Sequence, residues 1–533
     1  MNKTFYLILL FVLTSLQLFS STPGLIWHTV YGTSAYNQQV LVMTIDNYDN
    51  MFAAGYVNFG TSGNIIINRY DGVGNLKWNR IYNNSYPSGT TDKPVAVFPD
   101  NQTGVTVVAY VNTQAVITHI LHYDATGYLQ TNYAVGDSTS GSKTMPVAVI
   151  YDGASSFYMI GQLNNVSKVF KCDNTGNVIW AAPLHNAFNN EVGSISFDPN
   201  GNIIAAVFDS VLPQVVIHRY NANSGNEMHG FNTGIDSLPA NSSPINIAVD
   251  QNSNIFLAGT GMDSLGHIQL TVHKFDTSGT HLWATICNSS KGHSNEVNSF
   301  LLDHYGDVLI SGPYIDYADT LQFGGLYKIS NADGGVLWFA IDSQFLVNNA
   351  VTQVDQFSNV YFGTTRTPST ISPEYSNFSF SQLTSDSGLV KWNRSFDNSA
   401  DNTGLIMRIN NFGDLFFATN NPTDSSSAWF LGRVGNNAGD STGTAVQNIE
   451  PDYSLAVFPN PFASLTNVSF TALQTENLSV KLYDITGQVL QQQQIQSVAG
   501  LNSFTLKTNA APGIYLLRLE GSASTSVKQV VVY

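Results

Sequence analysis

Charge and cysteine are both scarce in this chain. Only 11% of the 533 residues are charged, and 37 acidic residues against 21 basic ones give a formal net charge of −16. Nucleic acid and anionic lipid surfaces are therefore disfavoured as partners, because like charges repel. The 2 cysteines, Cys172 and Cys287, are too few for a disulfide-stapled scaffold. They fall in separate parts of the repeat pattern described below, which favours small buried thiols over a disulfide.

Catalytic signatures and long apolar runs are also missing. The sequence has no G-x-S-x-G, H-E-x-x-H, C-x-x-C, P-loop or dinucleotide fingerprint. His218 and His273 occupy equivalent strand positions, but two histidines are too few for a metal centre. We therefore expect no catalytic residue, no metal site and no cofactor. Beyond the N-terminus no apolar run reaches the length of a membrane span, so we expect no transmembrane segment.

The N-terminus has the order of a secretory signal. Lys3 precedes an apolar run over 5–13, and small polar residues follow to Thr22. Residues 1–22 are therefore predicted to be a signal peptide, since the run is too short to span a bilayer. No cysteine lies near the expected cleavage region, which disfavours a lipid anchor.

The C-terminus contains short strands separated by breaks. Residues 479–483 and 515–519 alternate apolar and polar side chains, whereas Pro-Asn-Pro, Thr-Gly and Pro-Gly interrupt the strands. We expect a small antiparallel β-sandwich over 453–533.

Four blocks in this region, A-V-F-P-N-P, L-Y-D-I-T-G, P-G-I-Y-L-L-R-L and K-Q-V-V-V, stand in that order at the end of the chain. Together they resemble the sorting domain of the type IX (Por) secretion system. The resemblance implies recognition by an outer-membrane translocon and a secreted or outer-surface location, reached through the periplasm. Its motif residues are Pro459, Asn460, Pro461, Tyr483, Asp484, Gly487, Gly513, Ile514, Tyr515 and Lys528.

Between the two ends, over residues 24–434, a unit of about fifty residues recurs eight times. Its first half is an apolar strand, a polar turn and a second apolar strand, as in 247–259. Its second half is a strand, a D-x-x-G turn and a strand that carries tryptophan, as in 69–78. Two such hairpins form one four-stranded blade. The turn residues of the first halves are Asp46, Asp100, Asp152, Asp198, Asp250, Asp303, Asp355 and Asn410.

The tryptophans fix the phase of the repeats. The units end with Trp78, Trp180, Trp283, Trp338 and Trp392, whereas Gln130 and Met228 stand near that place in two degenerate copies. The last unit lacks its tryptophan strand, and residues 24–31 carry that pattern without a first half before them. We therefore predict that 25–30 pairs with 430–434 and closes an eight-bladed β-propeller, because closure removes an exposed sheet edge. Residues 435–452 are a predicted linker.

These repeats resemble the β-propeller repeats of secreted bacterial proteins, and their G-x-x-x-W halves are similar to the tryptophan-docking motif of eight-bladed quinoprotein dehydrogenases. The resemblance implies architecture rather than chemistry. A quinoprotein-like oxidoreductase is a weak alternative, because such an enzyme is expected to have adjacent cysteines and a set of calcium-binding acids. This chain has no adjacent cysteines.

Two sets of carboxylates are candidates for binding a cation or a ligand. The turn acids do not fit the D-x-[DN]-x-[DN]-G pattern of an EF-hand loop, so we expect them to accept hydrogen bonds within their own turns. A second set, expected in the loops that enter the innermost strands, can converge at the channel mouth and bind a cation or a basic group. This set comprises Asp92, Glu191, Glu296 and Asp401. The alternative is that each caps a strand or faces solvent.

Long polar loops between second and third strands supply further candidates. In a propeller these loops lie on the same face as the connections between blades, and exposed tyrosines near acids suit glycan or protein recognition. The candidates are Tyr314, Asp316, Tyr317, Glu374 and Tyr375. Surface solubility alone also explains them.

Two functional classes follow. The leading hypothesis is a secreted or cell-surface binding or adhesion module without catalysis, with a glycan or protein ligand on the long-loop face. The rival is a hydrolase or lyase that acts on an extracellular polymer through channel-mouth carboxylates. A purely structural surface protein differs from the first only in having no ligand.

Overall fold

The computed structural model describes residues 23–32, 37–59, 62–82, 92–100, 103–112, 115–184, 193–209, 214–235, 245–262, 267–287, 292–294, 296–316, 322–342, 347–366, 378–396, 403–423, 426–435, 456–458, 462–472, 476–484, 488–498, 500–511, 513–521 and 525–532. The chain divides into two compact units, Met1–Gly439 and Asp440–Tyr533. All regular elements in the described residues are strands.

The first unit consists of antiparallel sheets, named here in chain order. Sheet 1 contains β2 (Asn37–Ile45), β3 (Met51–Phe59), β4 (Ser62–Tyr70) and β5 (Leu76–Tyr82). Sheet 2 contains β6 (Lys93–Pro99), β7 (Val105–Asn112), β8 (Val116–Tyr123) and β9 (Leu129–Val135). Sheet 3 contains β10 (Met145–Tyr151), β11 (Ser156–Leu163), β12 (Val166–Asp173) and β13 (Val178–Pro183). Sheet 4 contains β14 (Gly193–Phe197), β15 (Ile203–Asp209), β16 (Gln214–Tyr220) and β17 (Glu227–Asn232).

The later sheets have the same order. Sheet 5 contains β18 (Asn246–Val249), β19 (Ile255–Met262), β20 (Ile268–Phe275) and β21 (His281–Cys287). Sheet 6 contains β22 (Gly292–Ser294), β23 (Ser299–Leu302), β24 (Val308–Asp316), β25 (Gln322–Ile329) and β26 (Val336–Asp342), and both β22 and β23 pair with β24. Sheet 7 contains β27 (Val347–Val354), β28 (Val360–Arg366), β29 (Phe378–Leu383) and β30 (Val390–Phe396). Sheet 8 contains β31 (Thr403–Ile409), β32 (Leu415–Thr423), β33 (Ser426–Gly435) and β1 (Gly24–Tyr31).

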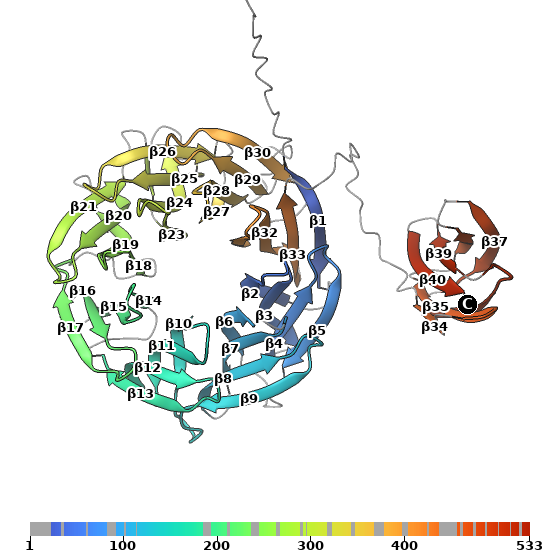
Figure 1. Cartoon of the computed structure of the whole chain (residues 1–533), viewed down its shortest axis with the longest axis horizontal. Helices are drawn as coiled ribbons and strands as arrows, with labels where there is room; N and C mark the ends of the chain where they lie inside the picture. Colours follow the sequence, from blue (N-terminus) through green and yellow to red (C-terminus); the bar gives the residue numbers. More distant parts are fainter. Residues whose placement is uncertain are drawn as a thin grey trace, which may run out of the picture. The chain divides into compact units, whose positions relative to one another are not determined.

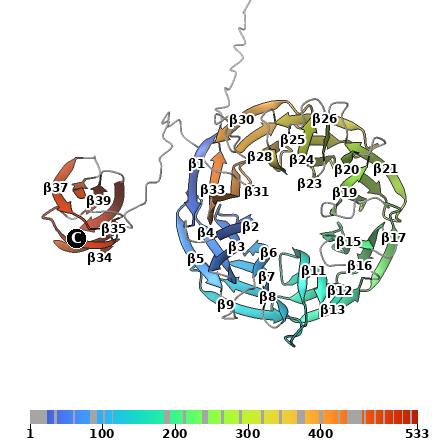
Figure 2. The same cartoon turned by 180° about the vertical axis from the view of Figure 1, so that it is seen from behind.

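The sheets follow one another around a common centre, with the first strand of each sheet innermost and the fourth outermost (Figures 1 and 2). Neighbouring sheets pack face to face, so a middle strand is covered on both sides. All side chains of β11 except Gln162 are buried, whereas those of the outer strand β17 are mostly exposed. One cluster, for example, joins Phe52 and Ile65 of sheet 1 to Val107 and Leu121 of sheet 2. The core is therefore a series of apolar layers between successive sheets.

The N-terminal strand pairs with the end of the repeat region. In β1, Leu25 lies opposite Val434 and Val30 opposite Phe430, with a bulge between Leu25 and Trp27. This is the pairing that the tryptophan pattern of 24–31 predicts. Sheets 8 and 1 also share an apolar cluster that contains Met43 of β2, and the single bridge Asn37↔Ser427 joins them.

A tryptophan on the outer strand ties one sheet to the next. The indole Nε1 of Trp78 donates to the carbonyl oxygen of Ala125 in the D-x-x-G turn of sheet 2, at 3.1 Å. The same bond joins Trp27 to Gly72, Trp180 to Ala222, Trp283 to Asn331 and Trp338 to Ser385. Each acceptor carbonyl also accepts a hydrogen bond from a basic side chain, which is the cross-strand partner of the docked tryptophan. These partners are Arg433 for Trp27, Arg69 for Trp78, Lys171 for Trp180, Lys274 for Trp283 and Lys328 for Trp338.

Trp392 is the exception to this docking rule. The outer strand of sheet 8 is β1, which comes from the other end of the chain. No turn therefore connects the third and fourth strands of sheet 8, and Trp392 has no turn carbonyl to dock on. Its cross-strand partner is Gln382 instead of a basic residue, and its Nε1 donates to Gln382 Oε1 at 2.9 Å within its own sheet. Arg433 at the other side of sheet 8 does follow the rule, because its partner Trp27 reaches sheet 1.

The second unit contains two sheets. One has the order β34 (Ala456–Phe458), β35 (Leu465–Ala472) and β38 (Gly500–Lys507), and the other has the order β37 (Val489–Gln496), β36 (Asn477–Tyr483), β39 (Gly513–Glu520) and β40 (Thr525–Val532). Val468 and Phe470 of the first sheet share a buried cluster with Leu482 and Leu517 of the second. The sheets therefore enclose one core, as alternation in the sequence predicts.

Candidate functional site

The turn acids of the first halves are acceptors within their own turns, as predicted. Asp250 Oδ1 accepts the backbone N–H groups of Asn252 and Asn254 at 2.9 and 2.8 Å, and its Oδ2 accepts the Asn254 side chain at 2.8 Å. Asp46, Asp198 and Asp355 make the same set of contacts. These carboxylates stabilise hairpins, because each occupies the N–H groups that a tight turn leaves unpaired.

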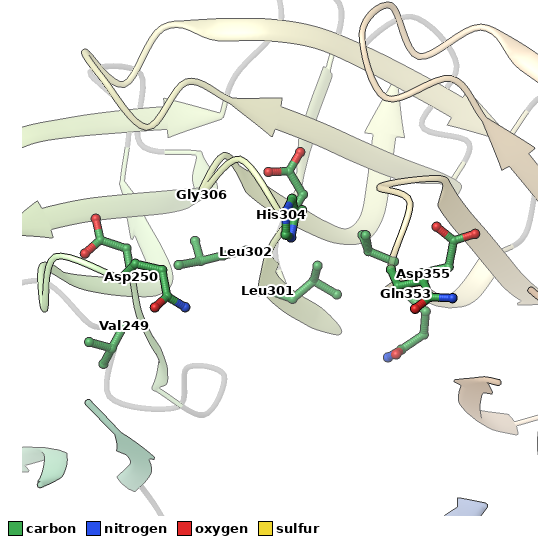
Figure 3. A pocket seen from close by; sticks show the side chains of 12 residues that line it. Val249, Asp250, Leu301, Leu302, His304, Gly306, Gln353 and Asp355 are labelled. Atoms are coloured by element: carbon green, nitrogen blue, oxygen red, sulfur yellow. The ribbon is translucent and has the colours of Figure 1, made fainter. Parts of the chain in front are cut away.

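The inner hairpins of sheets 5, 6 and 7 surround a cavity of 640 Å³ (Figure 3). It is called here the inner-hairpin cavity. Its apolar lining comes from Val249, Leu301, Leu302 and Val354, and its polar lining includes His304 and three glutamines. The glutamines are Gln251, Gln353 and Gln356. The volume and the amide groups suit a small polar ligand or a segment of a larger one.

The carboxylates around this cavity are already engaged. Asp303 Oδ1 accepts the N–H groups of Tyr305 and Asp307, and its Oδ2 lies 2.7 Å from Lys328 Nζ. Lys328 Nζ also lies 3.4 Å from Asp307. Asp250 and Asp355 are held by their turns, so the cavity has no pair of carboxylates free for acid–base chemistry. Within the described ranges, no three His, Cys, Asp or Glu side chains gather as a metal ion would require.

Asp92, one of the predicted channel-mouth acids, is almost completely buried, at 2% exposure. Its Oδ1 accepts the N–H of Asn112 at 2.8 Å, and its own N–H donates to Gly63 O at 2.9 Å. Burial raises the pKa of this carboxyl to about 6, although the Asn112 N–H acts in the opposite direction. Asp92 thus joins sheet 2 to sheet 1 through its backbone N–H, whereas its buried carboxyl, with a pKa raised to about 6, is bonded within sheet 2.

The other predicted residues do not form a common site with Asp92. Glu296 is exposed between β22 and β23 on sheet 6, and Figure 1 shows β6 and β23 on different sides of the centre. Tyr314 is not on an exposed loop as expected: β24 extends to Asp316, and Tyr314 is 1% exposed with its ring 5.2 Å from that of Phe339. Asp316 is half-buried at the end of β24. The remaining candidates lie outside the described residues: Glu191, Asp401, Tyr317, Glu374 and Tyr375.

Both cysteines are buried and unpaired with each other, as predicted. Burial raises the pKa of each thiol to about 12, so neither is a nucleophile at neutral pH. His218 Nδ1 lies 2.8 Å from Glu227 Oε1, and His273 Nδ1 lies 3.3 Å from His281 Nε2. The two histidines, which occupy equivalent strand positions, therefore pair within their own sheets.

One set of surface residues did not emerge from the sequence. Large apolar side chains stand exposed at the tips of inner hairpins, two residues after the turn acid or amide: Tyr48, Tyr305, Phe357 and Phe412. The signal was present as a repeated Asp or Asn, then any residue, then an aromatic residue. It is hidden because the same position holds Ala154, Asn200 and Asn252 in other repeats.

The sorting-motif residues are split between described and undescribed parts. Tyr483 ends β36, and Asp484 Oδ1 accepts the N–H of Gln488 at 3.0 Å in the turn that follows. Tyr515 is nearly buried in β39, and its hydroxyl donates to Ala511 O at 2.6 Å. Gly513 and Ile514 begin β39, and Lys528 is exposed on β40. Pro459, Asn460, Pro461 and Gly487 lie outside the described residues.

Several solved structures resemble the chain at low sequence identity. BamB from Moraxella catarrhalis is 12% identical with a TM-score of 0.43, over 77% of this chain and 98% of that one. The WD40 domain of SCAP from fission yeast is 11% identical with a TM-score of 0.41, over 77% and 98% of the two chains. The dihydro-heme d1 dehydrogenase NirN is 9% identical with a TM-score of 0.41, over 86% and 76%. A comparison with curated proteins gave no match.

No helix in the described part of the chain is long and apolar enough to cross a membrane. Residues 456–533 match the family model of the secretion system C-terminal sorting domain. The match covers the two-sheet unit and the four sequence blocks described above. The chain is thus a β-propeller repeat protein whose C-terminal unit is a type IX (Por) sorting domain, which marks it for export to the cell surface or beyond.

Proposed function

We propose that this protein is an exported binding module without catalytic activity, built on a closed ring of eight blades. The observation that carries the proposal is the engagement of the carboxylates around the inner-hairpin cavity. Asp250, Asp303 and Asp355 accept hydrogen bonds from their own turns, and Asp303 also pairs with Lys328. A general acid or nucleophile must instead be free to reach a substrate.

The contacts between sheets 8 and 1 support ring closure. Trp27 follows the docking rule of the internal junctions, and Arg433 Nη2 contacts Asp49 of sheet 1 at 2.8 Å. Asn420 Oδ1 accepts the N–H of Val40 at 2.7 Å, and its Nδ2 donates back to Val40 O at 3.2 Å. In this arrangement β1 covers the edge of β33, which would otherwise be open to pair with another chain.

The sorting domain indicates where the protein acts. A signal peptide over 1–22 takes the chain into the periplasm, and the C-terminal unit, joined by the linker 435–452, directs passage across the outer membrane. The ring then meets its ligand outside the cell. A glycan or protein ligand fits such a place, since surface loops and turns on a rigid scaffold commonly carry binding residues.

A binding array tests this function. The chain without residues 1–22 is applied to immobilised glycans and surface proteins, and in parallel to extracellular polysaccharides and peptides assayed for cleavage. We expect reproducible binding without cleavage. Cleavage that disappears in the Glu191→Gln, Glu296→Gln double variant would establish the rival hydrolase or lyase, because the amides retain shape and lose proton transfer. Absence of any ligand would favour a structural surface protein.

A further inference from the structure

Four exposed aromatic residues form an arc on consecutive sheets. Tyr305, Phe357, Phe412 and Tyr48 belong to sheets 6, 7, 8 and 1 and are 71%, 70%, 77% and 66% exposed, respectively. All four stand at the turn between the first and second strands of their sheet. These turns lie at the end of the sheet opposite to the connections between second and third strands, because the four strands are antiparallel. The set is called the aromatic arc.

Each ring is presented by the same rigid turn. The side chain of the first turn residue accepts the backbone N–H of the aromatic residue, at 2.8 Å in Asp46–Tyr48, 2.9 Å in Asp303–Tyr305 and Asp355–Phe357, and 3.0 Å in Asn410–Phe412. The next residue has a left-handed backbone: Asp49, Gly306, Ser358 or Gly413. Because this backbone is fixed, only the two side-chain torsions of each ring remain to be ordered when a ligand binds.

The arc is continuous from sheet 6 to sheet 1. Tyr305 and Phe357 line the same pocket of 480 Å³. Gln356 Nε2, next to Phe357, donates to Asn411 O, next to Phe412, at 3.0 Å. Asn410 Nδ2 of the same turn donates to Asp49 Oδ1, next to Tyr48, at 2.9 Å. The tips of sheets 7, 8 and 1 are therefore hydrogen-bonded in series, and those of sheets 6 and 7 share a pocket.

Carboxylates outnumber cations along the arc. Arg433 pairs with Asp49 and Asp414 at 2.8 and 2.5 Å. Lys328 pairs with Asp303 and Asp307, and it lies 5.9 Å from the centre of the Tyr305 ring. The excess of negative charge repels an anionic lipid or a polyanion. Amides and backbone groups stand between the rings, so the surface is not one continuous apolar patch. Aromatic rings that alternate with hydrogen-bonding groups suit an amphipathic sugar chain better than a membrane.

We propose that the aromatic arc binds a neutral polysaccharide chain, with sugar rings stacked on separate aromatic side chains and sugar hydroxyls hydrogen-bonded to the amides between them. Such rings bury apolar area at low conformational entropy, and the intervening amides both donate and accept hydrogen bonds. The inference rests on the proposed binding function and names its ligand class. It places recognition on the turn face, opposite to the long-loop face favoured by sequence alone.

Affinity electrophoresis through gels that contain soluble neutral polysaccharides tests the proposal, with β-glucan, xyloglucan, mannan and starch as separate probes. The chain without residues 1–22 is compared with the Tyr48→Ala, Tyr305→Ala, Phe357→Ala, Phe412→Ala variant. We expect at least one polysaccharide to retard the parent and the Kd of the variant to rise about tenfold or more. Tyr128→Ala is the matched control, because Tyr128 is 68% exposed and its N–H is held by a turn acid, Asp124, outside the arc.

Two further variants separate recognition from folding. Phe357→Tyr with Phe412→Tyr retains both rings and should retain retardation, whereas Phe357→Ala with Phe412→Ala should lose most of it. Thermal unfolding confirms that each variant is folded. No retardation by any neutral polysaccharide, or equal retardation of the fourfold variant, overturns the inference. If the binding array identifies a glycan or protein ligand and the fourfold variant still binds it, the aromatic arc is not the binding surface, whereas the proposed binding function is retained.

Discussion

Substitution of Gly74 measures directly whether Trp27 docks onto sheet 1. Gly74 has a φ of +88°, and a Cβ at this position would lie 2.5 Å from Trp27 Cδ2. A left-handed alanine costs about 1–2 kcal/mol, and forcing a methyl group against a packed ring costs about 1–3 kcal/mol more. We therefore expect Gly74→Ala to lower the free energy of unfolding by about 3 kcal/mol.

Gly201 provides the matched control. Its φ of +77° is close to that of Gly74, but a Cβ there would meet no atom within 4 Å. Gly201→Ala should cost only the backbone part, about 1 kcal/mol. The cost of Gly74→Ala should fall to the same value in a Trp27→Ala background, because the ring that causes the clash is gone.

Urea unfolding of the four proteins of this cycle, followed by circular dichroism, supplies the free energies. The coupling between positions 27 and 74 should be about 2 kcal/mol. An equal cost of Gly74→Ala with and without Trp27 would refute the docking. It would also remove the main support for β1 as the outer strand of the last blade.

Three other outcomes are expected. Asp92→Asn should stabilise the protein by about 1–2 kcal/mol at pH 8, because burial raises the folded pKa of this carboxyl to about 6. The wild-type carboxyl is protonated below pH 4 in both the folded and the unfolded state, and the folded protein loses stability as the pH rises through 6 and the buried group ionises. A difference in unfolding free energy between wild type and variant that stays constant from pH 4 to pH 8 would contradict the assignment. The thiols of Cys172 and Cys287 should resist a thiol reagent at pH 8 in the native protein and react in denaturant, and rapid native labelling would show that they are accessible. Truncation after Asp452 should leave a folded ring in the periplasm, as measured by fractionation, and surface display at the wild-type level would disprove the role of the C-terminal unit.

The repeats could be predicted because turns and tryptophans recur at a fixed period. The Asp46 and Asp250 turns and the outer-strand place of Trp78 and Trp283 are all local chemistry. The pairing of 24–31 with the end of the repeat region was also predictable, since that segment carries a tryptophan strand without its hairpin. These features could be predicted because each is marked by a pattern of side chains within one short segment of the sequence.

The docking carbonyls could not be predicted in the same way. The acceptors are backbone oxygens of Gly72, Ala125 and Asn331, and no common side chain marks them. The basic residues that donate to the same carbonyls stand two positions before the turn acid, as in Arg69 and Lys274. Only the cross-strand register, however, shows that each lies opposite a docked tryptophan. Tyr314 was misplaced for a related reason: β24 continues through Pro313, a residue that usually interrupts a strand.

The docking rule also explains where recognition can lie. Each docked tryptophan and its basic partner bond to the turn between the third and fourth strands of the next sheet, so that turn is constrained by sheet packing at these five junctions. The turn between the first and second strands docks no tryptophan. Its own Asp or Asn holds it, together with bonds between neighbouring tips on sheets 7, 8 and 1, and its third residue varies from asparagine to phenylalanine among the repeats. Variation is tolerated there because the tip contacts neither core nor neighbouring tryptophan. The outer turns therefore hold neighbouring sheets together, and the exposed side chains at the inner hairpin tips are the positions that can vary to carry a binding surface.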